Sequence, residues 1–240
     1  PRRGGPWQGI PHGLHGEGVA TDSTGTSNDA TYAGTYSTGQ IGDAFDMSSG
    51  ATLPDSATSD VAGFSEYAIS LWIKRAVTAN GWVQIVNKDY AGGGLGIYRY
   101  SNTSDITVKH GGSAWLRLTG LYDAINDGNW HYLGIRWDGT TTYGSVDGGT
   151  EVSVANATSP GNVATAYSLD STYTDGIDNF RITDSALSAN WIEDEYANQS
   201  DPYSFYSVAA PATSGVPTLS SVTATSITVD AITPNVTLTF

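Results

Sequence analysis

The chain has 240 residues, of which 10 are basic and 24 are acidic, giving a formal net charge of −14 at neutral pH. This balance disfavours nucleic acid as a partner, because phosphate binding needs a clustered basic face and the basic residues here are scattered. The absence of cysteine excludes a disulfide framework and a thiolate metal site. No apolar run approaches the roughly 20 residues of a membrane-spanning helix, so membrane insertion is not expected.

The first predicted elements are short strands separated by tight turns. The 29 glycines, 7 tryptophans and 14 tyrosines indicate an all-β protein. Alternating or apolar runs predict strands at 44–48, 66–75, 82–88, 95–100, 105–109, 129–137, 140–146, 163–170 and 177–183. The inward side chains expected from these runs are Phe45, Ile69, Leu71, Ile73, Ile85, Ile97, Ile106, Tyr132, Ile135, Val146, Ile177 and Ile182. Residues 188–199 predict a helix capped by Ser188, with Ile192 and Tyr196 on one face.

Three segments carry a more specific signal. Residues 127–149 (DGNWHYLGIRWDGTTTYGSVDGG) predict a hairpin with an Asp-Gly turn, residues 66–75 (EYAISLWIKR) predict a strand, and residues 176–192 (GIDNFRITDSALSANWI) predict a closing strand followed by a helix start. In order and spacing they resemble the laminin G-like, concanavalin A-like jelly-roll superfamily. The resemblance implies a two-sheet antiparallel jelly-roll sandwich over residues 14–208, with one short C-terminal helix and a short β tail.

The ends of the chain lie outside this predicted domain. Residues 1–13 are rich in proline and glycine and predict an irregular lead-in without the apolar middle of a signal peptide. Residues 209–217 have the composition of a linker. Residues 218–240 predict two strands that are either a truncated immunoglobulin- or fibronectin-like domain or a hairpin that adds to a sheet edge. Pairing of this tail between subunits would give a homo-oligomer.

The resemblance also implies one structural calcium ion, bound where an N-terminal loop meets the closing strand. Glu17, Asp22 and Asp178 occupy the ligand positions, and Asn28 is an additional candidate. Calcium prefers six to eight oxygen ligands, which glycine-rich loops supply from side chains and carbonyls. The alternative is that Asp22 and Asp178 only accept hydrogen bonds from turn amides.

Two loops combine aromatic and polar residues in the way that sugar sites do. Asp89 and Tyr90 precede a triple glycine, and His110, Trp115 and Arg117 follow another strand. We expect Trp72, Trp130, Trp137 and Trp191 to pack in the core or at an edge, whereas the pattern does not decide for Trp82 and Trp115.

Catalytic motifs are weak in this sequence. Glu193, Asp194 and Glu195 form a dense acidic run on the predicted helix, which indicates a solvated face. His131 is expected to pack beside Trp130 without an acid-base partner fixed by sequence. We therefore predict that the chain is not an enzyme.

The leading hypothesis is a non-catalytic, calcium-stabilised binding or adhesion module that recognises a glycan or cell-surface polysaccharide. The resemblance implies an extracellular, cell-surface or virion-surface location. One alternative is a structural subunit of an extracellular fibre or surface assembly, paired through residues 218–240. A second is a polysaccharide-cleaving enzyme, because the same scaffold carries lectins, adhesins, virion proteins and glycosidases.

Overall fold

The structure, a computed structural model, describes residues 12–14, 20–75, 81–169 and 174–202. The chain divides into two compact units, residues 1–205 and 206–240, and every described residue lies in the first. The predicted linker at 209–217 and the tail at 218–240 therefore lie outside the described residues. Within the described residues, no helix is long and apolar enough to span a membrane.

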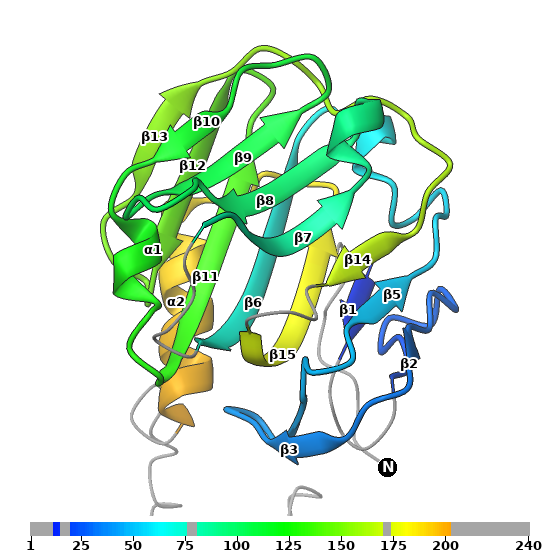
Figure 1. The fold of residues 1–240 in the computed structure, drawn as a ribbon, viewed down its shortest axis with the longest axis vertical. Coiled ribbons are helices and arrows are strands. Elements are labelled where there is room, and N and C mark those ends of the chain that lie inside the picture. Colours follow the sequence, from blue (N-terminus) through cyan, green and yellow to red (C-terminus); the bar gives the residue numbers. More distant parts are fainter. Residues whose placement is uncertain (1–11, 15–19, 76–80, 170–173, 203–240) are drawn as a thin grey trace, which may run out of the picture. The chain divides into compact units, whose positions relative to one another are not determined.

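Two antiparallel sheets form this unit, as the composition and motifs predict (Figure 1). The eight-stranded sheet has the order β13 (Val152–Ala155), β12 (Thr141–Val146), β11 (Trp130–Trp137), β6 (Tyr67–Arg75), β15 (Thr174–Thr183), β4 (Asp43–Phe45) and β3 (Tyr36–Thr38), with β1 (His12–Leu14) also paired to β15. The seven-stranded sheet has the order β10 (Leu116–Leu118), β9 (Ile106–His110), β8 (Leu95–Arg99), β7 (Val83–Lys88), β14 (Tyr167–Leu169), β5 (Ala51–Leu53) and β2 (Thr31–Tyr32). Sheet pairing begins at His12, inside the segment predicted to be irregular.

Three short helices lie between strands, and a fourth follows the last strand of the described residues. They are the 3₁₀ turns η1 (Val61–Gly63) and η2 (Tyr90–Gly92) and the α-helices α1 (Leu121–Ala124) and α2 (Ala189–Ser200). The Ser188 side chain accepts a hydrogen bond from the Trp191 amide, which confirms the predicted cap of α2.

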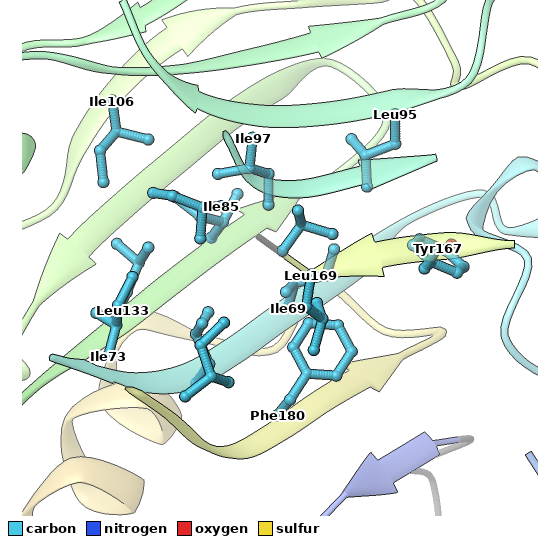
Figure 2. Packing of buried hydrophobic residues seen from close by; sticks show 14 of the residues in the cluster. Ile69, Ile73, Ile85, Leu95, Ile97, Ile106, Leu133, Tyr167, Leu169 and Phe180 are labelled. Atoms are coloured by element: carbon cyan, nitrogen blue, oxygen red, sulfur yellow. The ribbon is translucent and has the colours of Figure 1, made fainter. Parts of the chain in front are cut away.

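The core lies between the two sheets, where side chains from both inner faces meet (Figure 2). The residues labelled in the figure are Ile69, Ile73, Leu133 and Phe180 from the eight-stranded sheet and Ile85, Leu95, Ile97, Ile106, Tyr167 and Leu169 from the seven-stranded sheet. Of the predicted inward residues, all but Tyr132 and Val146 are fully buried here, and Val146 packs against the core while partly buried. Each large apolar side chain buried in this way contributes about 1.5–3 kcal/mol to stability.

A second apolar cluster lies on the outer face of the eight-stranded sheet. Trp72, Tyr132 and Ile192 are buried there, with Tyr196 packed against them. The prediction that Tyr132 points into the main core is wrong, because its neighbour Leu133 belongs to that core and adjacent strand residues face opposite ways. Helix α2 covers this second cluster through Ile192 and Tyr196, the face predicted from their spacing.

Polar contacts also fasten α2 to the sheet. Gln199 Oε1 accepts hydrogen bonds from Trp72 Nε1 at 2.6 Å and Asn179 Nδ2 at 2.9 Å. Glu195 accepts a hydrogen bond from the Tyr132 hydroxyl and forms an ion pair with Arg181. The prediction of a solvated acidic face is therefore wrong for Glu195, which is buried, whereas its two acidic neighbours are exposed.

The tryptophan predictions have a mixed outcome. Trp72 and Trp137 are buried and Trp130 is partly buried, as expected. The expectation of packing is wrong for Trp191, which is 47% exposed because it lies on the solvent side of α2.

Gly134 sets how closely α2 approaches the sheet. A Cβ atom at this position of β11 would lie 2.8 Å from Ile192 Cγ2, whereas a Cβ at Gly112 would meet nothing within 4 Å. We expect Gly134→Ala to lower the free energy of unfolding by about 1–3 kcal/mol, since overpacking displaces the helix. Urea denaturation measures this, with Gly112→Ala as the control. Equal stability of the two variants would contradict the described packing.

Candidate functional site

Two rows of residues cross the strands of the seven-stranded sheet on its outer side. The rows are Asn87, Gly96 and Lys109, and Gln84, Tyr98, Thr107 and Arg117. Ile97 and Val108, which precede Tyr98 and Lys109 in their strands, are buried in the core. Because neighbours along a strand point to opposite faces, burial of the apolar set directs the polar and aromatic set outward.

Five aromatic residues gather on this face, and we call them the aromatic cluster: Trp82, Tyr90, Tyr98, Tyr100 and Trp115. Their ring centroids lie between 4.6 and 6.1 Å apart in tilted or edge-on pairs. Tyr98 is buried at the base, whereas Trp82 is 44% exposed. The cluster therefore has a fixed base and one indole ring open to solvent.

Gly96 makes room for this arrangement. A Cβ atom there would lie 2.6 Å from Tyr98 Cε2 and 2.9 Å from Tyr90 Cβ, closer than packed atoms approach. Tyr90 can lie across β8 only because residue 96 has no side chain.

Two cationic side chains flank the rings. Lys109 Nζ lies 4.9 Å from the Trp115 ring centroid, and the Arg117 guanidinium lies 4.6 Å from that of Tyr100. Both distances are within the range of cation–π attraction. Arg117 Nε also donates a 2.6 Å hydrogen bond to Asp105, which fixes the guanidinium.

Amide side chains complete the polar surround. The Tyr98 hydroxyl donates to Gln84 Oε1 at 3.2 Å, and Gln84 Nε2 donates to Ser168 Oγ at 3.1 Å. Asn87 Oδ1 accepts from the Tyr90 amide at 3.2 Å. These contacts hold donors and acceptors in place beside the aromatic rings.

The structure brings Tyr90, Trp115 and Arg117 to this face, although they were predicted in two separate loops. Asp89 is used differently: its side chain accepts a hydrogen bond from the Gly92 amide and caps η2. The sequence reasoning left Trp82 undecided and missed Tyr98 and Tyr100. Tyr98 could have been predicted to face outward, because it follows Ile97, an apolar residue that was expected to face the core.

His110 does not belong to this surface, so its predicted sugar contact is wrong. The side chain is fully buried, with Nε2 2.5 Å from the Tyr67 hydroxyl and Nδ1 2.7 Å from Asn156 Nδ2 and 2.9 Å from the Thr158 carbonyl. It points inward because it continues the inward set of Ile106 and Val108.

Three of the four predicted calcium ligands are described, and Glu17 lies outside the described residues. The oxygens of Asp22 accept hydrogen bonds from Thr24, Thr26 and the Asn28 amide. Burial opposes ionisation of Asp22, but these hydrogen bonds outweigh it and lower its pKa to about 2. The Asn28 side chain is itself bonded to Ser56, Thr26 and Thr58. Asp22 and Asn28 thus form a hydrogen-bonded turn.

Asp178 differs from these two residues. It is fully buried on β15, where Oδ2 accepts from the Ile41 amide at 2.7 Å and Oδ1 has no hydrogen-bond partner among the described residues. Burial raises its pKa to about 6. Among the described residues, no group of three or more His, Cys, Asp or Glu side chains is arranged to hold a metal ion.

Residues 45–193 match the model of the concanavalin A-like lectin/glucanases superfamily. The chain belongs to this superfamily. The match includes the aromatic cluster and Asp178, and it confirms the predicted fold family. No curated protein sequence matches the chain significantly.

Solved structures of the same fold come from several sources. The binding domain of Paraclostridial Mosquitocidal Protein 1 has a TM-score of 0.66 at 13% identity, over 78% of this chain and 52% of that one. The binding domain of botulinum neurotoxin DC, in complex with SialylT, has a TM-score of 0.62 at 13% identity over 80% and 52%. Domain 4 of AbnA, an extracellular arabinanase from Geobacillus stearothermophilus in complex with arabinotriose, has a TM-score of 0.61 at 23% identity over 78% and 97%. The chain thus spans about half the length of the two toxin structures, and at these identities the likeness shows the fold alone.

His131 has two acidic partners, which were not predicted from the sequence. Its Nδ1 lies 2.7 Å from Asp147 Oδ2 and its Nε2 lies 2.9 Å from Asp127 Oδ1. Partial burial opposes its positive charge, but hydrogen bonds and charge from Asp147 and Asp127 outweigh this and raise its pKa. The three side chains join the two ends of the β11–β12 hairpin.

The two histidines should titrate on opposite sides of the ordinary value of 6.5. We expect an apparent pKa above 6.5 for His131 and one of about 4 for His110, which burial keeps neutral. Between pH 6.5 and about 4, His110 is protonated in the unfolded chain but neutral in the folded chain. The free energy of unfolding therefore decreases as the pH falls through this range. His131 has the opposite effect: its ion pairs add to the free energy of unfolding at low pH, and this stabilisation is lost as the pH rises through the raised pKa of His131. NMR titration of the imidazole signals tests both values, and a His110 signal that shifts near pH 6.5 would contradict its buried placement.

Proposed function

We propose that this chain is a non-catalytic carbohydrate-binding module and that glycans bind at the aromatic cluster. The observation that carries the proposal is the exposed Trp82 ring packed against Tyr100 and Trp115, on a face whose polar side chains are held by hydrogen bonds. Sugar sites combine an aromatic face, which packs against the apolar face of a pyranose, with fixed hydrogen-bond groups at its edge.

Relatives of the same fold support this proposal. One similar structure holds arabinotriose in a domain of an arabinanase, and another holds SialylT in a toxin binding domain. An extracellular or surface location belongs to the same proposal, because soluble or surface-linked glycans are the ligands that such a module would meet there.

The carboxylates flanking the aromatic cluster favour binding over hydrolysis. Asp89 caps its own turn, and Asp105 binds Arg117 and accepts a hydrogen bond from the Gly120 amide at 3.1 Å. Glycoside hydrolysis needs two carboxyl groups facing each other across the scissile bond. Neither Asp89 nor Asp105 is free to act as that pair.

Removal of the exposed indole ring should abolish most of the affinity. We expect Trp82→Ala to bind polysaccharide at least about tenfold more weakly, a loss of about 1.4 kcal/mol, since aromatic anchors dominate such interfaces. A glycan array in the presence of calcium identifies the ligand, and isothermal titration calorimetry measures its affinity.

Trp191→Ala is the matched control, because Trp191 is similarly exposed, at 47%, but lies on α2. A blank array for the natural chain, or equal affinity of Trp82→Ala and the natural chain, would contradict the proposed site. Release of reducing ends from any bound polysaccharide would contradict the non-catalytic role.

We further propose that Asp178 binds a structural calcium ion. A buried carboxylate with an unpaired oxygen is costly, and a hard cation would satisfy that oxygen and favour the charged form. Asp22 and Asn28 fit the role less well, because their side-chain oxygens already accept hydrogen bonds. Backbone carbonyls, water and Glu17 would supply the remaining ligands.

Calcium at saturating concentration should raise the melting temperature by about 5–10 °C, as binding to the native state alone would do. Asp178→Asn should remove this response, whereas Asp22→Asn should retain it. The isosteric amide should also make the calcium-free chain at least as stable as the natural chain at pH 7, because it removes a buried charge. Differential scanning calorimetry with calcium and with chelator measures each melting temperature. An unchanged calcium response in Asp178→Asn would place the ion elsewhere.

A further inference from the structure

Among the described residues, the lysine beside the aromatic cluster, Lys109, has no acidic partner. The chain has three lysines, and of these Lys88 forms ion pairs with Asp55 and Asp60, whereas Lys109 and Lys74 form none among the described residues. The neighbouring cation of the cluster, Arg117, is paired with Asp105. In a chain whose acidic residues outnumber its basic ones 24 to 10, an ammonium group without a carboxylate beside an aromatic surface is available for an anionic ligand.

Lys109 is also held in a defined position. Its Nζ donates a 2.8 Å hydrogen bond to the Ser113 carbonyl and lies 4.9 Å from the Trp115 ring centroid. An ammonium group has three donors, so the contact with Ser113 leaves others for a ligand. The ring centroids of Trp82 and Trp115 lie 4.6 Å apart. The exposed ring of Trp82 and the ammonium group of Lys109 therefore both contact the Trp115 ring.

The other charged side chains of this face already have partners. Arg117 and Asp105 neutralise each other, although the Arg117 side chain remains 48% exposed over Tyr100. The Asp89 carboxylate accepts a hydrogen bond from the Gly92 amide in its own turn. Lys109 is thus the cation of this face that has no carboxylate partner among the described residues, in a chain that carries −14 overall.

We infer that the glycan bound at the aromatic cluster is acidic, with a carboxylate or sulfate group that pairs with Lys109 while a sugar ring stacks on Trp82. The inference rests on the proposed function and specifies its ligand class. Selectivity arises because a neutral sugar leaves the ammonium of Lys109 without a counter-charge when the site loses water.

The experiment compares ligands that differ only in their charge. The pairs are oligogalacturonate and its methyl ester, sialyllactose and its methyl ester, and a sulfated galactan and its desulfated form. Titration calorimetry at low and high salt gives the affinity for each. We expect the acidic member of at least one pair to bind about fivefold or more tightly than its neutral partner, the upper range for a partly exposed ion pair. The advantage should shrink at high salt, because salt screens exposed charges.

Three variants assign that advantage to one side chain. Lys109→Gln should bind the acidic member about as weakly as the neutral one, and Lys109→Arg should restore the preference. Lys74→Gln is the control, because Lys74 is also half-buried and has no ion pair within the described part of the chain, but lies on β6 in the other sheet. Melting temperatures confirm that each variant folds.

The outcomes separate this inference from the proposed function. Equal binding of acidic and neutral members, or a preference that survives Lys109→Gln, overturns the acidic ligand and leaves the carbohydrate-binding site in place. Absence of binding to every probe overturns both.

Discussion

Burial of alternate side chains between two sheets is the constraint on which the rest of the structure depends. Ile97, Val108 and Leu118 must face the core to be removed from water. Their neighbours Tyr98, Lys109 and Arg117 must then face outward, where they meet Trp115 and Tyr100. A one-residue slip in register would bury the cations and expose the apolar residues. The proposed binding surface is thus a direct consequence of the packing that stabilises the sandwich.

The two outer faces of the sandwich are used differently. On the eight-stranded sheet, α2 covers Trp72 and Tyr132 and links them to Gln199 and Glu195. On the seven-stranded sheet, the aromatic rings pack on one another and leave Trp82 partly exposed. The same residue types therefore serve stability on one face and, in our proposal, recognition on the other.

Much of the fold follows from local sequence. Residues 66–75 and 127–149 contain long alternation with clear turns, and the strands and hairpin formed there as predicted. Strands β2, β5 and β10 have two or three residues each, too few for a periodic pattern to emerge.

The candidate site was harder to predict, because it is assembled by strand pairing. Trp82, Tyr90 and Trp115 are distant in sequence and meet only once β7, β8 and β9 are in register. His110 was predictable as buried, since it shares the parity of Ile106 and Val108, but the predicted strand ended one residue too early. The burial of Glu195 could not be read from α2 alone, because its partners Tyr132 and Arg181 come from two other strands.

The measurement that tests the central claim most directly is a ¹H–¹⁵N NMR titration with the tightest-binding glycan. It follows the indole signals of the tryptophans. Binding at the aromatic cluster predicts saturable shifts for Trp82 and Trp115, with the Trp191 and Trp137 signals unmoved. Saturable shifts confined to Trp191 or to residues of the eight-stranded sheet would contradict the account.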